Sequence, residues 1–172
     1  MVILRIIYKK EGNGIFISTN YLGKIFERAI RRLDIPLIFS HGYSGRPKLS
    51  MGPSIAVGIM GINEVIDFHL GNSDIPCLQI KEMLNQCLPE GLGVVECRYL
   101  TADEKSPPEI KKACYTVKIS NNMMVPNIPD NWNIVSRKGN FIDIIIGLDR
   151  FKHKDLFLLF GAENIIQRQL IF

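Results

Sequence analysis

The sequence predicts an α+β fold, because short β-rich runs alternate with amphipathic helical stretches along the chain. The 172 residues are 47% hydrophobic and 22% charged, which suits a packed core and excludes a globally disordered chain. We expect no membrane contact, because no run approaches ~18 consecutive apolar residues. The first residues lack the charged, apolar and small regions of a signal peptide, so we expect a cytoplasmic protein.

The first two predicted elements are a strand and a helix. Residues 3–9 form a β-rich run that ends at the turn-forming Glu11-Gly12-Asn13-Gly14. We expect the helix to begin after Ser18 or Thr19 and to end before Pro36, because the residue before a proline disfavours the α region. Apolar residues step along it by 3, 1, 3, 1 and 3 positions, namely Leu22, Ile25, Phe26, Ala29, Ile30 and Leu33.

The next elements complete a unit that covers residues 1–104. Residues 37–54 are rich in glycine and proline and predict a loop. Residues 55–60 and 64–70 predict a hairpin around Gly61-Ile62-Asn63, followed by a helix over 75–88 and a strand over 92–100. The order strand, helix, strand, strand, helix, strand is that of a ferredoxin-like βαββαβ unit.

A second, smaller α+β unit is predicted over residues 112–172, after a linker at 105–111 that contains Pro107-Pro108. We expect it to be an incomplete ferredoxin-like unit that lacks its first helix. Strands are predicted at residues 113–119, 133–137, 140–147 and 165–172. One short helix is predicted at residues 154–160.

Positive charge is concentrated in the first third of the chain. The whole protein carries a net charge of +4, but residues 1–50 hold nine basic groups against three acidic ones. Such an asymmetry indicates a surface that meets polyanions, such as RNA or phosphorylated ligands. An ordinary solvated face is the alternative.

The loop at residues 40–48 is the strongest candidate site. Glycines expose backbone N–H groups there, serines and a tyrosine offer hydroxyls, and the preceding helix supplies further cations. We predict phosphate contacts from Lys24, Arg28, Arg31, Arg46 and Lys48, and contacts to a base or sugar from His41 and Tyr43. A purely structural loop whose glycines satisfy turns is the alternative.

No metal or cofactor site is predicted. The four cysteines contain no C-x-x-C pair and are interpreted as small buried hydrophobes, and no two histidines approach metal-ligand spacing. Walker, G-x-S-x-G and H-E-x-x-H motifs are absent, as is the C-x-x-x-C-x-x-C of a radical-SAM cluster. His69 is interpreted as a strand residue and His153 as part of a solvated basic turn. We therefore expect no catalytic residues.

Residues 5–100 resemble a bacterial radical-SAM-linked domain family of unknown function, whose members occur alone or fused behind a radical-SAM, cobalamin-binding-type domain. The resemblance rests on Phe16-Ile17-Ser18, the run 26–32, Ser40-His41-Gly42-Tyr43, Pro47-Lys48-Leu49-Ser50 and Leu88-Pro89-Glu90-Gly91. The chain is a divergent member, because Thr19 and Arg46 stand where the family usually has histidine. The resemblance implies a radical-SAM protein as a partner.

These observations predict an RNA-binding accessory module that presents tRNA or rRNA beside a radical-SAM enzyme. One alternative is a metal-independent endoribonuclease built from tandem ferredoxin-like units, with His41 and Tyr43 as acid and base. Another is a protein-binding adaptor that docks a partner through its first helix.

Overall fold

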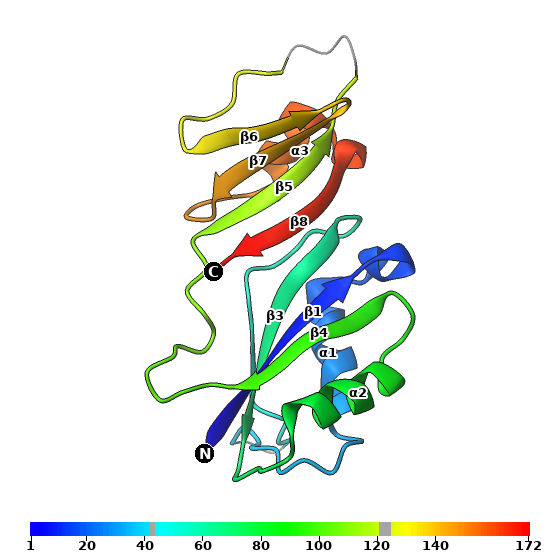
Figure 1. Cartoon of the computed structure of the whole chain (residues 1–172), viewed down its shortest axis with the longest axis vertical. Helices are drawn as coiled ribbons and strands as arrows, with labels where there is room; N and C mark the ends of the chain where they lie inside the picture. Colours follow the sequence, from blue (N-terminus) through cyan, green and yellow to red (C-terminus); the bar gives the residue numbers. More distant parts are fainter. Residues whose placement is uncertain (42–43, 121–124) are drawn as a thin grey trace.

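In the computed structural model, which describes residues 1–41, 44–120 and 125–172, eight strands form one mixed sheet (Figure 1). Seven strands follow the order β4-β1-β3-β8-β5-β7-β6, and β2 pairs with the far end of β3. All pairings are antiparallel except the short parallel contact between β3 and β8. The strands are β1 (Val2–Lys10), β2 (Leu49–Met51), β3 (Met60–Leu70), β4 (Leu92–Tyr99), β5 (Lys112–Lys118), β6 (Trp132–Lys138), β7 (Phe141–Gly147) and β8 (Ile165–Ile171).

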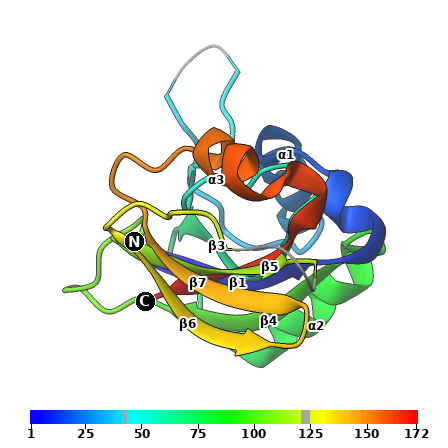
Figure 2. The same cartoon turned by 90° about the horizontal axis from the view of Figure 1, so that it is seen from above.

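Two clusters of buried side chains lie between the sheet and the helices α1 (Thr19–Ile30), α2 (Cys77–Cys87) and α3 (His153–Phe160). The first joins α1 and α2 to β1, β3 and β4, and the second joins α3 to β5, β7 and β8. Figure 2 shows α1 and α3 on the same side of the sheet. Of the helices that the structure describes, none is long and apolar enough to cross a membrane.

The predicted tandem of ferredoxin-like units is wrong. The strands of both halves belong to one continuous sheet, because β3 from the first half pairs in parallel with β8 from the end of the chain, at Met60 with Gln167 and Gly61 with Arg168. Side chains strengthen this contact, since Arg168 forms a buried ion pair with Glu64. The local order of strands and helices did not reveal the pairing between distant strands.

The predicted hairpin around residues 61–63 is also wrong. Residues 60–70 form one uninterrupted strand, and the short partner that runs beside it is β2. The turn-forming Asn63 instead contacts β8: its amide nitrogen donates to the Leu170 carbonyl at 2.9 Å, and its oxygen accepts from the Leu170 N–H at 2.7 Å. Gly61 and Asn63 therefore serve the packing of two strands and make no turn.

An extended connection joins β4 to β5 across the predicted linker. The Arg5 guanidinium donates to the Lys105 carbonyl at 2.7 Å, and Ile110 is buried in the second cluster. The division into residues 1–104, a linker at 105–111 and residues 112–172 stays a prediction.

Candidate anion-binding site

Helix α1 presents one apolar and one cationic side, as its sequence predicts. Leu22, Phe26 and Ile30 are buried in the first cluster. Lys24, Arg28 and Arg31 are exposed on the side that faces away from that cluster. A short amphipathic helix depends on such burial for its stability. Packing of the apolar side therefore fixes the position of the helix backbone that carries the cations.

The loop between α1 and β2 begins and ends in a short ladder next to β3. The Ser40 N–H donates to the Arg46 carbonyl at 2.8 Å, and the Lys48 N–H donates to the Ile38 carbonyl at 2.7 Å. This pair of segments is bonded in turn to His69 of β3, through Ile38 at 2.9 Å and Lys48 at 3.0 Å. Arg46 is therefore held at a defined position on the same side of the sheet as α1, where the loop projects in Figure 2.

A cavity of about 390 Å³ lies between α1 and this loop. Glu27 and Arg31 form an ion pair at 3.0 Å across one wall. No carboxylate of the described residues pairs with the other three cations, which are left to bind an anion. The lining residues are Lys24, Glu27, Arg28, Arg31, Ser44, Gly45 and Arg46.

Four of the predicted phosphate-binding residues meet in this cavity, namely Lys24, Arg28, Arg31 and Arg46. Lys48 and His41 are exposed but do not line it. Tyr43 lies outside the residues that the structure describes. The predicted contacts from Lys48 and His41 therefore receive no support from the cavity.

Phe39 was not predicted as a site residue. The residue is 45% exposed, and the Arg31 guanidinium carbon lies over its ring at 5.2 Å from the ring centroid. In the sequence Phe39 follows Leu37 and Ile38 at the start of the predicted loop 37–54, and no pattern marks it as a binding residue. Only the pairing of residue 39 with Pro47 shows that it belongs to a bridge beside the cavity.

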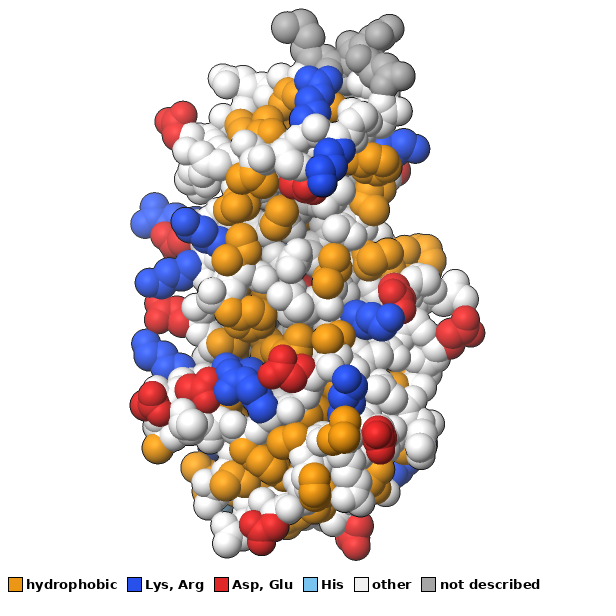
Figure 3. Space-filling model, in the orientation of Figure 1, with side chains coloured by type: hydrophobic (Ala, Val, Ile, Leu, Met, Phe, Trp, Pro, Cys, Tyr) orange, Lys and Arg blue, Asp and Glu red, His pale blue; other side chains and the backbone are white. Residues whose placement is uncertain are grey.

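The opposite face of the molecule has a different character. Figure 3 shows basic and acidic side chains interspersed there, with apolar side chains between them. Among the cations that do not line the cavity, two are paired with carboxylates: Arg98 binds Glu104 at 2.7 Å, and Lys105 binds Glu109 at 3.2 Å. Mixed charge of this kind attracts polyanions less than the α1 side does.

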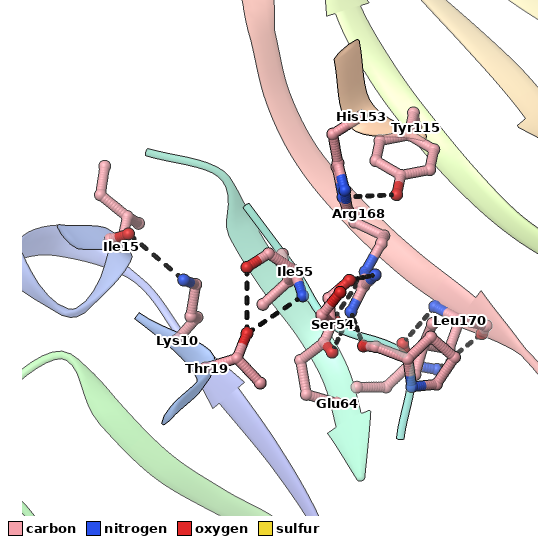
Figure 4. A network of polar contacts seen from close by, with 12 residues as sticks. Lys10, Ile15, Thr19, Ser54, Ile55, Glu64, Tyr115, His153, Arg168 and Leu170 are labelled. Atoms are coloured by element: carbon pink, nitrogen blue, oxygen red, sulfur yellow. Dashed lines mark hydrogen bonds and ion pairs between the residues drawn. The ribbon is translucent and has the colours of Figure 1, made fainter. Parts of the chain in front are cut away.

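A second polar group of side chains, buried on the helix side of the sheet, joins the two halves (Figure 4). Arg168 donates to Glu64 at both carboxylate oxygens and to the carbonyls of Ser54 at 2.7 Å and Pro53 at 2.8 Å. Lys10, the last residue of β1, donates to the carbonyls of Ile15 and Ile17 in the segment before α1. Burial lowers the pKa of Lys10 to about 8. Both cations have hydrogen-bond acceptors within the protein, so we interpret their role as structural.

His153 belongs to the same region and corrects a prediction. It is part-buried beside Phe151 and Phe157, and its Nε2 lies 3.2 Å from the Tyr115 hydroxyl. Burial, with the nearby Arg168 cation, lowers its pKa to about 4. His153 is therefore not a solvated turn residue.

The cysteines and histidines form no metal site in the part of the chain that the structure describes, where no three side chains of His, Cys, Asp or Glu come together. The four cysteines are free and half-buried, which is less complete burial than the sequence predicts. Burial raises the pKa of Cys97 to about 12, so its thiol is a poor nucleophile.

The sequence matches a bacterial family over residues 4–141, described as an uncharacterized protein conserved in bacteria, DUF2344. Because the match covers most of the chain, the chain belongs to this family. No curated protein matches the sequence.

Proposed function

We propose that this chain is a cytoplasmic RNA-binding accessory module that binds the phosphates of tRNA or rRNA at the cavity beside α1. The observation that carries the proposal is the meeting of Lys24, Arg28, Arg31 and Arg46 in one cavity. Arginine guanidinium groups stay charged and bind phosphate oxygens in pairs, which suits a nucleic-acid backbone.

Ion pairing within the cavity sets the expected strength of binding. Glu27 partly neutralises Arg31, so about three cations are available for phosphate. If three to five phosphates are neutralised in all, log K should fall against log salt with a slope of roughly −2 to −4 for single strands.

Nitrocellulose filter binding of labelled tRNA and rRNA fragments, over a series of salt concentrations, tests this proposal. Charge reversal of Arg28 and Arg31 together should abolish binding and leave the circular dichroism spectrum unchanged. The matched control reverses the exposed Lys152 and Lys154 at the start of α3, which changes the net charge equally outside the cavity. If no RNA binds at low salt, or if both double variants lose the same affinity, the proposal is wrong.

We also propose a radical-SAM enzyme as the partner, which the resemblance of residues 5–100 supports. Size-exclusion chromatography of the chain with a radical-SAM protein from the same genome tests it. A shared peak supports the partnership, and separate elution with and without RNA contradicts it.

The endoribonuclease alternative receives less support from the site. His41, its proposed acid or base, does not line the cavity, and Arg46 cannot exchange a proton near neutral pH. We expect no cleavage of tRNA or structured RNA by the purified chain, with EDTA or with added zinc or manganese. Cuts that disappear in a His41→Ala variant would instead favour the nuclease.

A further inference from the structure

Phe39 is an exposed aromatic residue next to Arg31, one of the residues that line the cationic cavity. Its neighbour Ser40 is bonded to Arg46 through the backbone at 2.8 Å, and the Arg46 N–H donates to the Ser40 hydroxyl oxygen at 3.2 Å. These two bonds tie the segment that carries the ring to the segment that carries a cavity cation. The backbone of Phe39 is therefore held beside the cavity by the ladder.

Arg31 connects the ring to the cavity. Its guanidinium lies over the Phe39 ring at 5.2 Å from the centroid, and the same side chain lines the cavity wall. A cation over a ring face is favourable, so the arginine is held next to the ring. Phe39 as a whole is still 45% exposed, which leaves room for a second flat group.

Phosphate binding alone does not account for this arrangement. A single exposed aromatic residue is common on protein surfaces. An exposed ring beside unpaired cations is instead the combination that binds single-stranded nucleic acid, in which cations follow the backbone and aromatic rings stack on the bases.

A neighbouring groove gives the backbone a path along α1. A second hollow of about 470 Å³ shares Lys24, Glu27 and Arg46 with the first cavity and continues to Thr19 and Asn20 at the start of α1. The two hollows together follow most of a helix of 12 residues, which is about 18 Å long. That length accommodates more than one nucleotide.

We infer that Phe39 stacks on an unpaired base and that the ligand of this groove is single-stranded RNA. This inference rests on the proposed RNA-binding function. Duplex RNA stacks its bases on one another and offers no base face to Phe39, so it gains only the phosphate contacts.

Fluorescence anisotropy with three labelled probes of equal length tests the inference. The probes are a single-stranded RNA, an abasic ribose-phosphate strand of the same charge, and an RNA duplex. We expect the wild-type protein to bind the single strand about five- to one-hundred-fold more tightly than the abasic strand, the range expected for one stacked base. The Phe39→Leu variant should lose this difference and keep its affinity for the abasic strand.

Phe141→Leu is the matched control, because Phe141 is 42% exposed and lies on β7, away from the cavity. It should bind all three probes as the wild-type protein does. Phe39→Trp should retain the preference for the base-bearing strand.

The outcomes separate the inference from the proposed function. Equal wild-type affinity for the single strand and the abasic strand overturns the role of Phe39 and leaves RNA binding intact. Absence of binding to all three probes at low salt overturns the proposed function itself. A folded Phe39→Leu variant that keeps the wild-type preference for the base-bearing strand also overturns the role of Phe39. If that variant fails to fold, equal wild-type affinities for the two strands still overturn the inference.

Discussion

Arg168 of β8 and Glu64 of β3 form an ion pair that is almost completely buried, although 104 positions separate them in the chain. Arg168 also donates to the carbonyls of Pro53 and Ser54. The pair stands where the parallel contact joins the two halves of the sheet, so it links two strands that have few backbone bonds between them.

Removing one partner of this pair should be costly. Arg168→Met leaves the Glu64 carboxylate and two carbonyls buried without donors, and we expect it to lower the free energy of unfolding by about 3–5 kcal/mol. Arg98→Met, which breaks the surface pair with Glu104, should cost about 1 kcal/mol or less. Urea denaturation measures both.

A double-mutant cycle tests the coupling. The double variant Arg168→Met/Glu64→Gln should lose less free energy of unfolding than the sum of the two single losses. The reason is that Glu64→Gln removes the carboxylate that Arg168→Met leaves buried without a cation. Additive losses would mean that the two side chains act independently.

Stability should depend on pH through His153. Burial and Arg168 lower its pKa from 6.5 to about 4. Between these values the unfolded chain binds more protons than the folded one. The free energy of unfolding should therefore rise with pH between about 4 and 6.5, and the contribution of His153 should be lost as the pH falls through this range.

The His153→Phe variant isolates this effect. From pH 7 to pH 5 the wild-type protein should lose about 1 kcal/mol more stability than the variant, after allowance for solvent screening of a part-buried group. Guanidinium denaturation at the two pH values measures the difference. Equal losses would show that His153 does not drive the acid sensitivity.

Gly91 should be intolerant of a side chain. Its φ is +86°, and a Cβ there would overlap the backbone nitrogen of Gly14 and lie 2.6 Å from the Glu11 carbonyl oxygen. Gly12 is a matched control, because its φ is also positive, at +50°, but its Cβ would meet nothing within 4 Å.

Gly12→Ala should therefore cost about 1–2 kcal/mol from backbone strain alone. Gly91→Ala should cost roughly 2 kcal/mol more, because the backbone must also shift. Thermal denaturation ranks the two, and equal melting temperatures would contradict the close approach.

Arg46 should matter for binding and not for folding. It is exposed and forms no ion pair among the described residues, so Arg46→Ala should change stability by no more than about ±0.5 kcal/mol. Its RNA affinity should fall by about 1–3 kcal/mol, the usual value of a charge-assisted contact. Unchanged affinity would place the site elsewhere.

The sequence by itself determined helix α1 and its cationic side. The apolar residues from Leu22 to Leu33 recur with the period of an α-helix. This period involves only residues close together in the chain, so it can be read without the tertiary structure. The same spacing places Lys24, Arg28 and Arg31 on the polar side, so most of the candidate site was predictable.

Only the tertiary structure decided which strands pair and what the buried polar groups do. Hydrogen bonds between β3 and β8 join residues about 107 positions apart. The residue pattern within a strand does not indicate which other strand pairs with it. Arg168 appears in the sequence as an ordinary basic residue, and Phe39 lies in the predicted loop at residues 37–54 with no signal that marks it. Burial of the first and exposure of the second depend on distant segments that fold against them, which is why neither role could be predicted.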